Sequence, residues 1–130
     1  MVLNIEDRNK YLNLVVSKDG EVQIFRNGVL IAFAVVELDL YEDCNYLSNL
    51  KVIEKGDRGR GLGKMLVTAV NSLIKKNSKV GELDVGVENV VAQRLYLSGG
   101  WRYVDKEEVD KDKERGLQVS YYKMEYRHEG

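Results

Sequence analysis

A chain of 130 residues is long enough for one compact domain and too short for two of ordinary size. Its 20 Lys and Arg residues nearly balance its 21 Asp and Glu residues, so the net charge of −1 argues against a protein that coats nucleic acid or binds membranes through basic residues. One cysteine (Cys44) excludes an internal disulfide, one histidine (His128) leaves too few ligands for a zinc site, and no apolar run is long enough for a membrane span or a secretory signal. The sequence therefore predicts a single cytoplasmic domain over residues 1–130, without a metal.

The first half of the chain predicts antiparallel strands joined by tight turns. Tyr11–Ser17 and Glu21–Phe25 are β-rich runs, and Lys18-Asp19-Gly20 between them supplies the turn chemistry of a hairpin. Asn27-Gly28 is a stronger turn signal, because both residues tolerate a positive φ. It leads into Val29–Leu38, an apolar and β-branched run suited to a central strand. A meander of three strands follows from these runs.

A fourth strand, a helix and a further strand come next. Tyr46–Ile53 predicts the fourth strand, whose register depends on whether a bend or bulge falls within it. From Gly61 onward the apolar residues follow the i, i+3, i+4, i+7 spacing of one helical face: Leu62, Met65, Leu66, Ala69, Val70, Leu73 and Ile74. The alternation of Leu83, Val85 and Val87 then predicts another strand, within Gly81 to Val87.

The last third of the chain predicts a second helix and two more strands. Asn89 can cap the helix, and Gly99-Gly100 can end it. Trp101–Val104 and Val119–Met124 are candidate final strands, whereas the charged stretch Asp105–Arg115 has the composition of a solvated loop. The order is four strands, helix, strand, helix and two strands, which predicts an α/β (mixed α+β) fold with a largely antiparallel first half.

A glycine-rich turn joins the fourth strand to the first helix and reads Arg58-Gly59-Arg60-Gly61-Leu62-Gly63-Lys64. The first N–H groups of a helix have no intrahelical partner and the helix dipole is positive there, so we expect an anion to bind at this end. Glycines let the backbone approach a pyrophosphate closely, and the basic side chains add mobile positive charge. From Lys55 to Val80 there are seven basic residues and one acidic residue, so the turn lies in a locally positive field.

Two better-known phosphate loops do not fit this turn. A Walker A loop needs a glycine five positions before the glycine of its Gly-Lys pair and a Ser or Thr after the lysine, where this chain has Arg58 and Met65. A dinucleotide fingerprint needs G-x-G-x-x-G in an early βαβ unit, whereas this turn has G-x-G-x-G after antiparallel strands. A glycine-rich loop with a solvated basic rim and no ligand is the remaining alternative.

Two motifs together resemble those of the GCN5-related N-acetyltransferase (GNAT) superfamily. The R-x-x-G-x-G spacing of Arg58, Gly61 and Gly63 is similar to the acyl-CoA-binding motif of that family. A second signature follows in the right order and at about the right distance, and it comprises Asn89, Ala92, Leu95-Tyr96 and Gly100-Trp101. The resemblance covers Tyr46–Val104. It implies a mixed, mostly antiparallel sheet flanked by helices, in which the fourth and fifth strands run parallel and splay apart to admit the pantetheine arm of acetyl-CoA.

The resemblance also implies where the acetyl-CoA cosubstrate binds. The backbone of Leu50, Lys51 and Val52 would pair with the pantetheine amides as another strand would. The pyrophosphate would lie on the turn, held by Arg58, Gly59, Arg60, Gly61, Leu62, Gly63 and Lys64. Asn89 would contact the same ligand, although an Asn before a helix can serve only as its N-cap. The link between Val52 and Arg58 is one residue longer than usual in the family and lacks its common proline. The strand residue that faces the ligand can therefore differ by one position from the family pattern.

The chemistry implied by the resemblance is direct attack of a neutral amine on the thioester carbonyl, without a covalent enzyme intermediate. Tyr96 matches the tyrosine that donates a proton to the departing sulfur and also touches the cosubstrate, unless it only packs on the apolar helix face. The base that takes the ammonium proton is left open among Glu37, Asp39 and Glu42, each of which can equally be a surface carboxylate. Cys44 is interpreted as a small, partly buried side chain rather than a nucleophile.

The N-terminal part departs from the family pattern. Members usually have one or two helices between their first and second strands that form part of the acceptor pocket, whereas Tyr11–Leu38 is strand-like with tight turns. The acceptor side is then open to an exposed amine or completed by a second subunit, and we expect a homodimer.

The predicted function is that of an N-acetyltransferase acting on a primary amine of a small molecule, peptide or protein. A non-catalytic CoA-binding or regulatory module of the same fold is the alternative. A nucleic-acid-binding function is the third alternative. It rests only on the basic stretch Lys55–Lys79, and the balanced charge of the whole chain argues against it.

Overall fold

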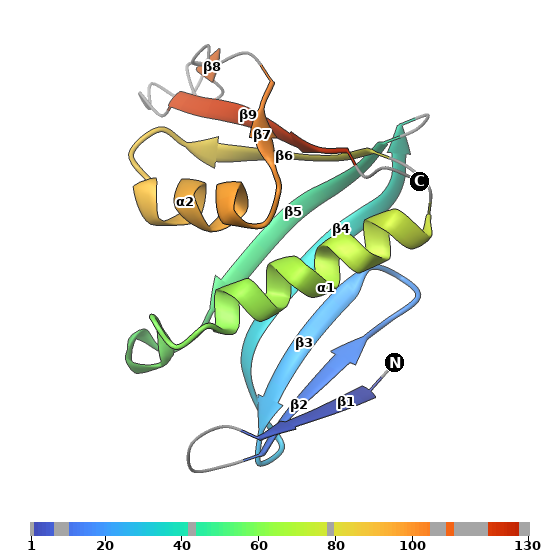
Figure 1. The fold of residues 1–130 in the computed structure, drawn as a ribbon, viewed down its shortest axis with the longest axis vertical. Coiled ribbons are helices and arrows are strands. Elements are labelled where there is room, and N and C mark those ends of the chain that lie inside the picture. The colour runs from blue at the N-terminus through green and yellow to red at the C-terminus, as the bar shows by residue number, and fades with distance from the viewer. Residues whose placement is uncertain are drawn as a thin grey trace.

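The computed structural model describes residues 2–6, 11–41, 44–77, 80–104, 109–110 and 120–127 (Figure 1). Its strands are β1 (Val2–Glu6), β2 (Tyr11–Val16), β3 (Glu21–Arg26), β4 (Val29–Tyr41), β5 (Cys44–Val52), β6 (Val80–Gly86), β7 (Arg102–Tyr103), β8 (Val109–Asp110) and β9 (Ser120–Tyr126). Its α-helices are α1 (Leu62–Lys76) and α2 (Val90–Ser98), and a short 3₁₀ helix, η1 (Lys55–Asp57), precedes α1. The predicted order of elements is confirmed apart from β1 and β8.

The strands form one sheet in the order β1-β2-β3-β4-β5-β6-β9-β7, with β8 beside β9. Every neighbouring pair is antiparallel except β5 and β6, which run parallel. A helix, α1, joins these two strands, as a parallel pair requires. The fold is therefore the predicted mixed α+β class, with a mostly antiparallel sheet and one parallel pair.

Two tight turns link the first strands, as the sequence predicts. Gly20 has a φ of 99°, and a Cβ there would clash with the carbonyl oxygen of Val36, so only glycine fits this approach of two strands. The Val36 N–H donates to the Gly20 carbonyl at 2.7 Å. Between β3 and β4, Asn27 has a φ of 52° and Gly28 a φ of 81°, which are the positive values that a two-residue hairpin turn needs.

The sequence predicts neither β1 nor β8. β1 pairs with β2 from Val2↔Val15 to Glu6↔Tyr11. β8 lies within the stretch Asp105–Arg115, so the prediction of a loop there is wrong at Val109–Asp110, which pairs with β9. Both are short strands at an edge of the sheet, where pairing is decided by the neighbouring strand more than by the local pattern. Val119, the expected start of the last strand, lies outside the described residues.

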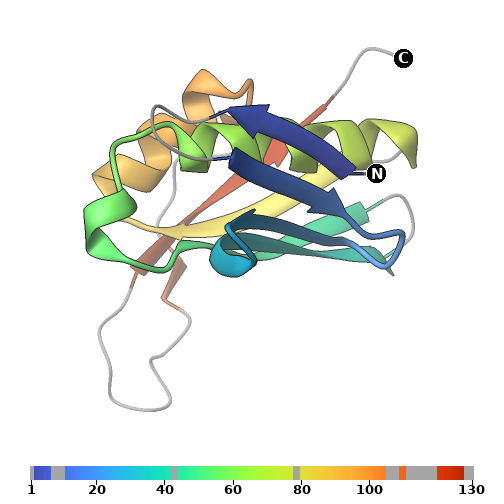
Figure 2. The same cartoon turned by 90° about the horizontal axis from the view of Figure 1, so that it is seen from below.

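Both helices pack on the same face of the sheet (Figure 2). Leu66, Val70 and Ile74 of α1 lose all contact with solvent and join a core that includes Ile24 and Ala34 from the strands. Residues 17–20 link β2 directly to β3, so no helix stands between these strands, as expected. The other face of β2 to β6 therefore carries no helix among the residues described. In the same residues, no helix is both long and apolar enough to cross a membrane.

Trp101 ties α2 to α1. The indole is fully buried, and its Nε1–H donates to Oδ1 of Asn71 on α1 at 2.8 Å. The Asn71 amide donates in turn to the carbonyl of Gly99 at the end of α2, at 2.7 Å. The rings of Tyr96 and Tyr126 flank the indole, with centroid distances of 6.1 and 5.7 Å. This cluster fixes the last turn of α2 and, with it, Tyr96.

Candidate functional site

β5 and β6 are paired at one end and diverge at the other (Figure 1). Their parallel register comprises Cys44↔Val80, Asn45↔Gly81 and Tyr46↔Glu82. Beyond Tyr46, β5 continues along β4 alone, while β6 continues beside β9. The edge of β5 that includes Leu50, Lys51 and Val52 therefore has no strand partner on the β6 side among the described residues. Such an edge can pair with an extended ligand that carries amides. The predicted splayed pair is confirmed.

A β-bulge lies where β5 leaves β6. Val35 of β4 pairs with Asn49, but Val36 pairs with Leu47, so Ser48 is an extra residue in β5. Its hydroxyl donates to the carbonyl of Val35 at 3.2 Å. A bulge takes one residue out of the hydrogen-bond ladder and bends the strand. The bend or bulge on which the predicted register depends is therefore present, at the start of the divergence.

The glycine turn follows β5 and η1, and the backbone N–H groups at the start of α1 have no hydrogen-bond partner within the described part of the chain. Gly59 and Gly61 have φ values of 79° and 86°, and a Cβ at either would meet nothing within 4 Å, so it is the backbone conformation that favours glycine there. Gly61 is the N-cap of α1 and supplies no side-chain hydrogen bond, and the first turn of α1 contains no acidic residue. Arg58, Arg60 and Lys64 are all exposed around this helix end. The arrangement suits an anion.

The other two residues predicted in the turn have structural roles. Leu62 is 3% exposed and belongs to the core. A Cβ on Gly63 would lie 3.0 Å from Cδ2 of Leu95, so this glycine allows α1 and α2 to approach closely. Their backbone groups still lie in the first turn of α1.

An ion pair that the sequence did not suggest anchors the turn. Nη1 of Arg26, the last residue of β3, donates to Oδ1 of Asp57 at 2.7 Å. The side chains are 17% and 12% exposed, so water screens the pair only in part. Asp57 directly precedes Arg58, and the pair therefore holds the glycine turn against the β3–β4 hairpin. Two oppositely charged residues this far apart in the chain carry no local signal.

α2 contributes both of the residues expected from it. The side-chain oxygen of Asn89 accepts the N–H of Ala92 at 3.2 Å, so the N-cap role is present. Tyr96 is 8% exposed, and no hydrogen bond to its hydroxyl is formed within the described part of the chain. Burial raises the pKa of Tyr96 above its usual value near 10, so the phenol stays protonated at neutral pH.

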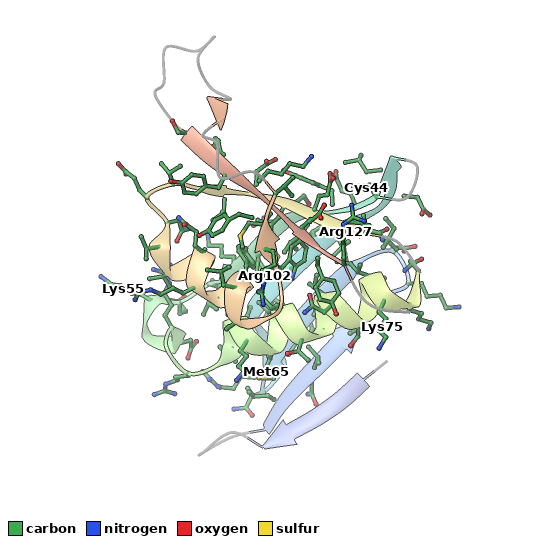
Figure 3. The ribbon with its side chains drawn as sticks, turned by 45° about the horizontal axis from the view of Figure 1, so that its top comes forward. Cys44, Lys55, Met65, Lys75, Arg102 and Arg127 are labelled. Carbon is green, nitrogen blue, oxygen red and sulfur yellow. The ribbon has the colours of Figure 1, made fainter. Side chains whose placement is uncertain are left out.

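Three polar contacts lie on the face of the sheet without helices. The Tyr46 hydroxyl donates to Oδ2 of Asp84 at 2.7 Å, across the divergence. The Cys44 thiol donates to Oε2 of Glu82 at 3.2 Å, and Lys123 Nζ lies 3.3 Å from Oε1 of the same carboxylate. Burial, together with the bond to Glu82 and its charge, raises the pKa of Cys44 to about 11, so it is a protonated thiol at neutral pH. Cys44 lies at the far end of the molecule from Lys55, near which β5 ends (Figure 3).

Of the three carboxylates expected near the acceptor, Glu37 lies beside these polar contacts. Glu37 pairs with Tyr46 across the strands and is exposed, whereas the Asp39 N–H donates to Oδ1 of Asn45 at 3.1 Å, at an irregularity of β4 where the φ of Asp39 is 57°. Glu42 lies outside the described residues. Asp84 was not predicted as a site residue, although its position on β6, an alternating strand of the splayed pair, is a usable signal.

A family model described as "Acetyltransferase (GNAT) family" matches residues 4–101. Similar solved structures include the ribosomal-protein-S18-alanine N-acetyltransferase of Escherichia coli, which is 23% identical with a TM-score of 0.66 over 85% of this chain and 70% of that one. Naa50 of Arabidopsis thaliana, in complex with the bisubstrate analogue CoA-Ac-MVNAL, is 19% identical with a TM-score of 0.70 over 85% and 74%. The PaiA N-acetyltransferase of Thermoplasma acidophilum, in complex with coenzyme A, is 20% identical with a TM-score of 0.65 over 83% and 60%.

These similarities show a shared fold, and the chain spans between 60% and 74% of the length of the three proteins. No curated protein sequence matches the chain. The family model, in contrast, matches well over half of the chain and includes both the divergent strands and the glycine turn. This chain therefore belongs to the acetyltransferase (GNAT) family.

Proposed function

We propose that this protein is a cytoplasmic enzyme that transfers the acetyl group of acetyl-CoA to a primary amine of a small molecule, peptide or protein. One observation carries the proposal: the unpaired edge of β5 leads through η1 directly into the glycine turn at the start of α1. An extended pantetheine arm suits the strand edge, and a pyrophosphate suits the helix end that follows it. A single ligand with both parts can occupy both features.

The proposed donor site uses the backbone more than side chains. Main-chain groups of Leu50, Lys51 and Val52 pair with the pantetheine amides. The N–H groups of residues 59–64 bind the pyrophosphate, and Arg58, Arg60 and Lys64 add positive charge around it. Asn89 keeps its capping bond and can still present its amide N–H to the ligand. The similar structures that hold coenzyme A or a CoA analogue support this assignment.

The proposed reaction is direct transfer within a ternary complex. The amine nitrogen, after losing the ammonium proton to solvent, bonds to the thioester carbonyl carbon. We assign the stabilisation of the carbonyl oxygen, as it becomes negative, to a backbone amide at the bulge of β5, where Ser48 leaves the ladder. The C–S bond then breaks, Tyr96 gives its proton to the sulfur, and the second proton of the nitrogen replaces it. The raised pKa of Tyr96 keeps this donor protonated.

Calorimetry and a thiol-release assay with a panel of amines test the proposal. We expect saturable binding of acetyl-CoA, and free thiol only when a suitable amine is present. Tyr96→Phe should lower turnover by about 10²-fold or more while leaving the affinity for coenzyme A within about twofold. Tyr103→Phe is the matched control, since it also removes a tyrosine hydroxyl, one that donates to Oε1 of Gln93 on α2 at 2.7 Å. Its turnover should stay close to that of the wild type.

Two results would decide against this function. Saturable binding with no thiol release for any amine would favour a non-catalytic CoA-binding or regulatory module. Absence of any binding of coenzyme A at about millimolar concentration would remove the donor site itself, since such binding is worth only about 4 kcal/mol.

We extend the proposal to a homodimer, because the acceptor side lacks the helices that usually complete it. A groove of about 600 Å³ runs along α1 on its β2 side, and its apolar lining includes Leu14, Val16, Met65, Ala69 and Leu73. Met65 lies on this side of α1 in Figure 3. A second copy can bury this apolar surface. Sedimentation should then show a dimer, and a concentration-independent monomer with full activity would contradict it.

A further inference from the structure

The groove of about 600 Å³ along α1 is walled by this helix on one side and by the end of β2 on the other. Figure 2 shows its origin: the sheet curls, so that β1 and β2 rise toward the level of the helices. Residues of α1 from Gly61 to Lys76 line the groove, a length of about 22 Å along the helix axis. A groove of this volume with a mainly apolar lining is typical of sites for small molecules. Apart from Gly61 and Lys64, its residues do not belong to the proposed donor site.

The lining is suited to a hydrocarbon chain over most of its length. Its apolar side chains come from both walls and are Leu14, Val16, Met65, Ala69 and Leu73. Two of the hydroxyls in the lining already have partners within the protein. Oγ1 of Thr68 donates to the carbonyl of Lys64 at 2.8 Å, and Oγ of Ser17 accepts the N–H of Asp19 at 3.0 Å. A chain that covers them therefore leaves neither hydroxyl unpaired, while it removes apolar surface from water.

Three lysines border this apolar lining. The ammonium groups of Lys18, Lys64 and Lys76 form no ion pair or hydrogen bond within the residues that the structure describes. None of the described residues that line the groove is acidic, and Asp19, which follows Lys18, is exposed in the turn and outside the lining. Figure 1 and Figure 2 both place the turn after β2 at the same end of the molecule as the end of α1. Lys18 and Lys76 therefore lie at one end of the groove, where an anionic group is favoured, and Lys64 lies at the other.

We propose that this groove binds a long-chain carboxylate, an unbranched hydrocarbon chain with one anionic end. The carboxylate lies at the end of the groove with Lys18 and Lys76, and the chain runs past Ala69 toward Met65. From Lys76 to Met65 the helix rises about 16 Å, which an extended chain of about twelve carbons spans. This inference goes beyond the proposed function, because binding here needs neither acetyl-CoA nor an amine. The homodimer proposed above would cover the same groove, so the ligand and a second copy exclude each other there.

A chain-length series tests the apolar part of the site. Octanoate, decanoate and dodecanoate are titrated into the full-length ¹⁵N-labelled protein, below their micelle concentrations and without acetyl-CoA. We expect saturable amide shifts at groove residues such as Ala69 and Leu73, and an affinity that rises about twofold to fourfold for each added CH₂ group. Dodecyltrimethylammonium has the same chain and the opposite charge, so it should bind at least about tenfold more weakly than dodecanoate.

Substitution of the lysines tests the charged end. Lys76→Gln should weaken dodecanoate binding about threefold, and the double variant Lys18→Gln/Lys76→Gln about tenfold, because both side chains are exposed and their charges are partly screened. Lys75→Gln is the matched control. It makes the same charge change at the adjacent residue of α1, which lines the groove on the α2 side instead, and it should leave the affinity unchanged.

Several results would overturn this site. Equal affinity of the double variant and the wild type for dodecanoate, or no saturation of the wild type up to about 5 mM, would do so. A dimer that persists in dodecanoate without any shift of the groove amides would make a second copy the occupant instead. Binding to phosphatidylglycerol vesicles without binding of free dodecanoate would make it a membrane surface. Loss of coenzyme A binding with retained dodecanoate binding would overturn the proposed function and leave this site standing.

Discussion

The two faces of the sheet have different side chains, because adjacent residues of one strand point to opposite faces. Leu83 and Val85 of β6 turn toward the helices and are buried, while Glu82 and Asp84 between and beside them turn to the helix-free face and form polar contacts. The covered face is closed by Trp101, which is fully buried. Apolar packing is concentrated on one face and polar contacts on the other, because side chains of a strand alternate between them. Neighbouring substitutions should therefore give different phenotypes.

The largest effect on stability should come from the covered face, at Trp101. Trp101→Ala removes a fully buried indole and leaves the Asn71 amide without its 2.8 Å partner. We expect a loss of about 3–5 kcal/mol in the free energy of unfolding, measured by urea denaturation. A loss below about 1 kcal/mol would show that this cluster does not hold α2 to α1.

Gly81 tests how closely the covered face is packed, at a position that has no side chain. A Cβ there would lie 2.5 Å from Cδ1 of Ile74 and 2.9 Å from Cη2 of Trp101, so the core must shift to admit it. Gly81→Ala should cost about 1–3 kcal/mol in the free energy of unfolding. Gly56→Ala is the control, since a Cβ there meets nothing within 4 Å and its cost should be within about 0.5 kcal/mol. Equal effects would contradict the close packing.

The ion pair of Arg26 and Asp57 should affect both folding and ligand binding. Removing the guanidinium with Arg26→Met leaves a largely buried carboxylate unpaired, so we expect a stability loss of about 1–3 kcal/mol, reduced by the residual exposure of both side chains. Because Asp57 precedes the glycine turn, the Kd for coenzyme A should rise by about threefold to tenfold in calorimetry. Unchanged affinity in a folded variant would show that the turn is positioned without the pair.

The smallest effect on stability belongs to Cys44, whose chemistry is nevertheless measurable. With a pKa of about 11 instead of 9.0, its thiolate fraction at pH 8 should be about 100-fold lower, and iodoacetamide should react correspondingly slowly. The stability that comes from the protonated thiol is complete below about pH 9 and is lost as the pH rises through about 11. Glu82→Gln should lower this pKa and speed alkylation. A rate like that of a free thiol at pH 8 would contradict the buried contact.

Local chemistry explains which elements could be predicted from the sequence. The turns at Lys18-Asp19-Gly20 and Asn27-Gly28, the apolar stripe of α1 and the Asn89 cap each depend on residues within a few positions of one another. The glycine turn belongs to this class too, since a positive φ and an uncapped helix end are properties of the segment itself. The fold class and the glycine turn could therefore be predicted.

Only the tertiary structure decided which side chains meet. The register of β5 on β6 brings Tyr46 to Asp84, and the fold brings Arg26 to Asp57, although neither pair is close in the chain. The edge strand β8 forms only because β9 lies beside it. A pattern in the sequence fixes which face of a strand a residue occupies, but the partner across the sheet depends on register and on the bulge at Ser48. Those are set by the packing of the whole domain.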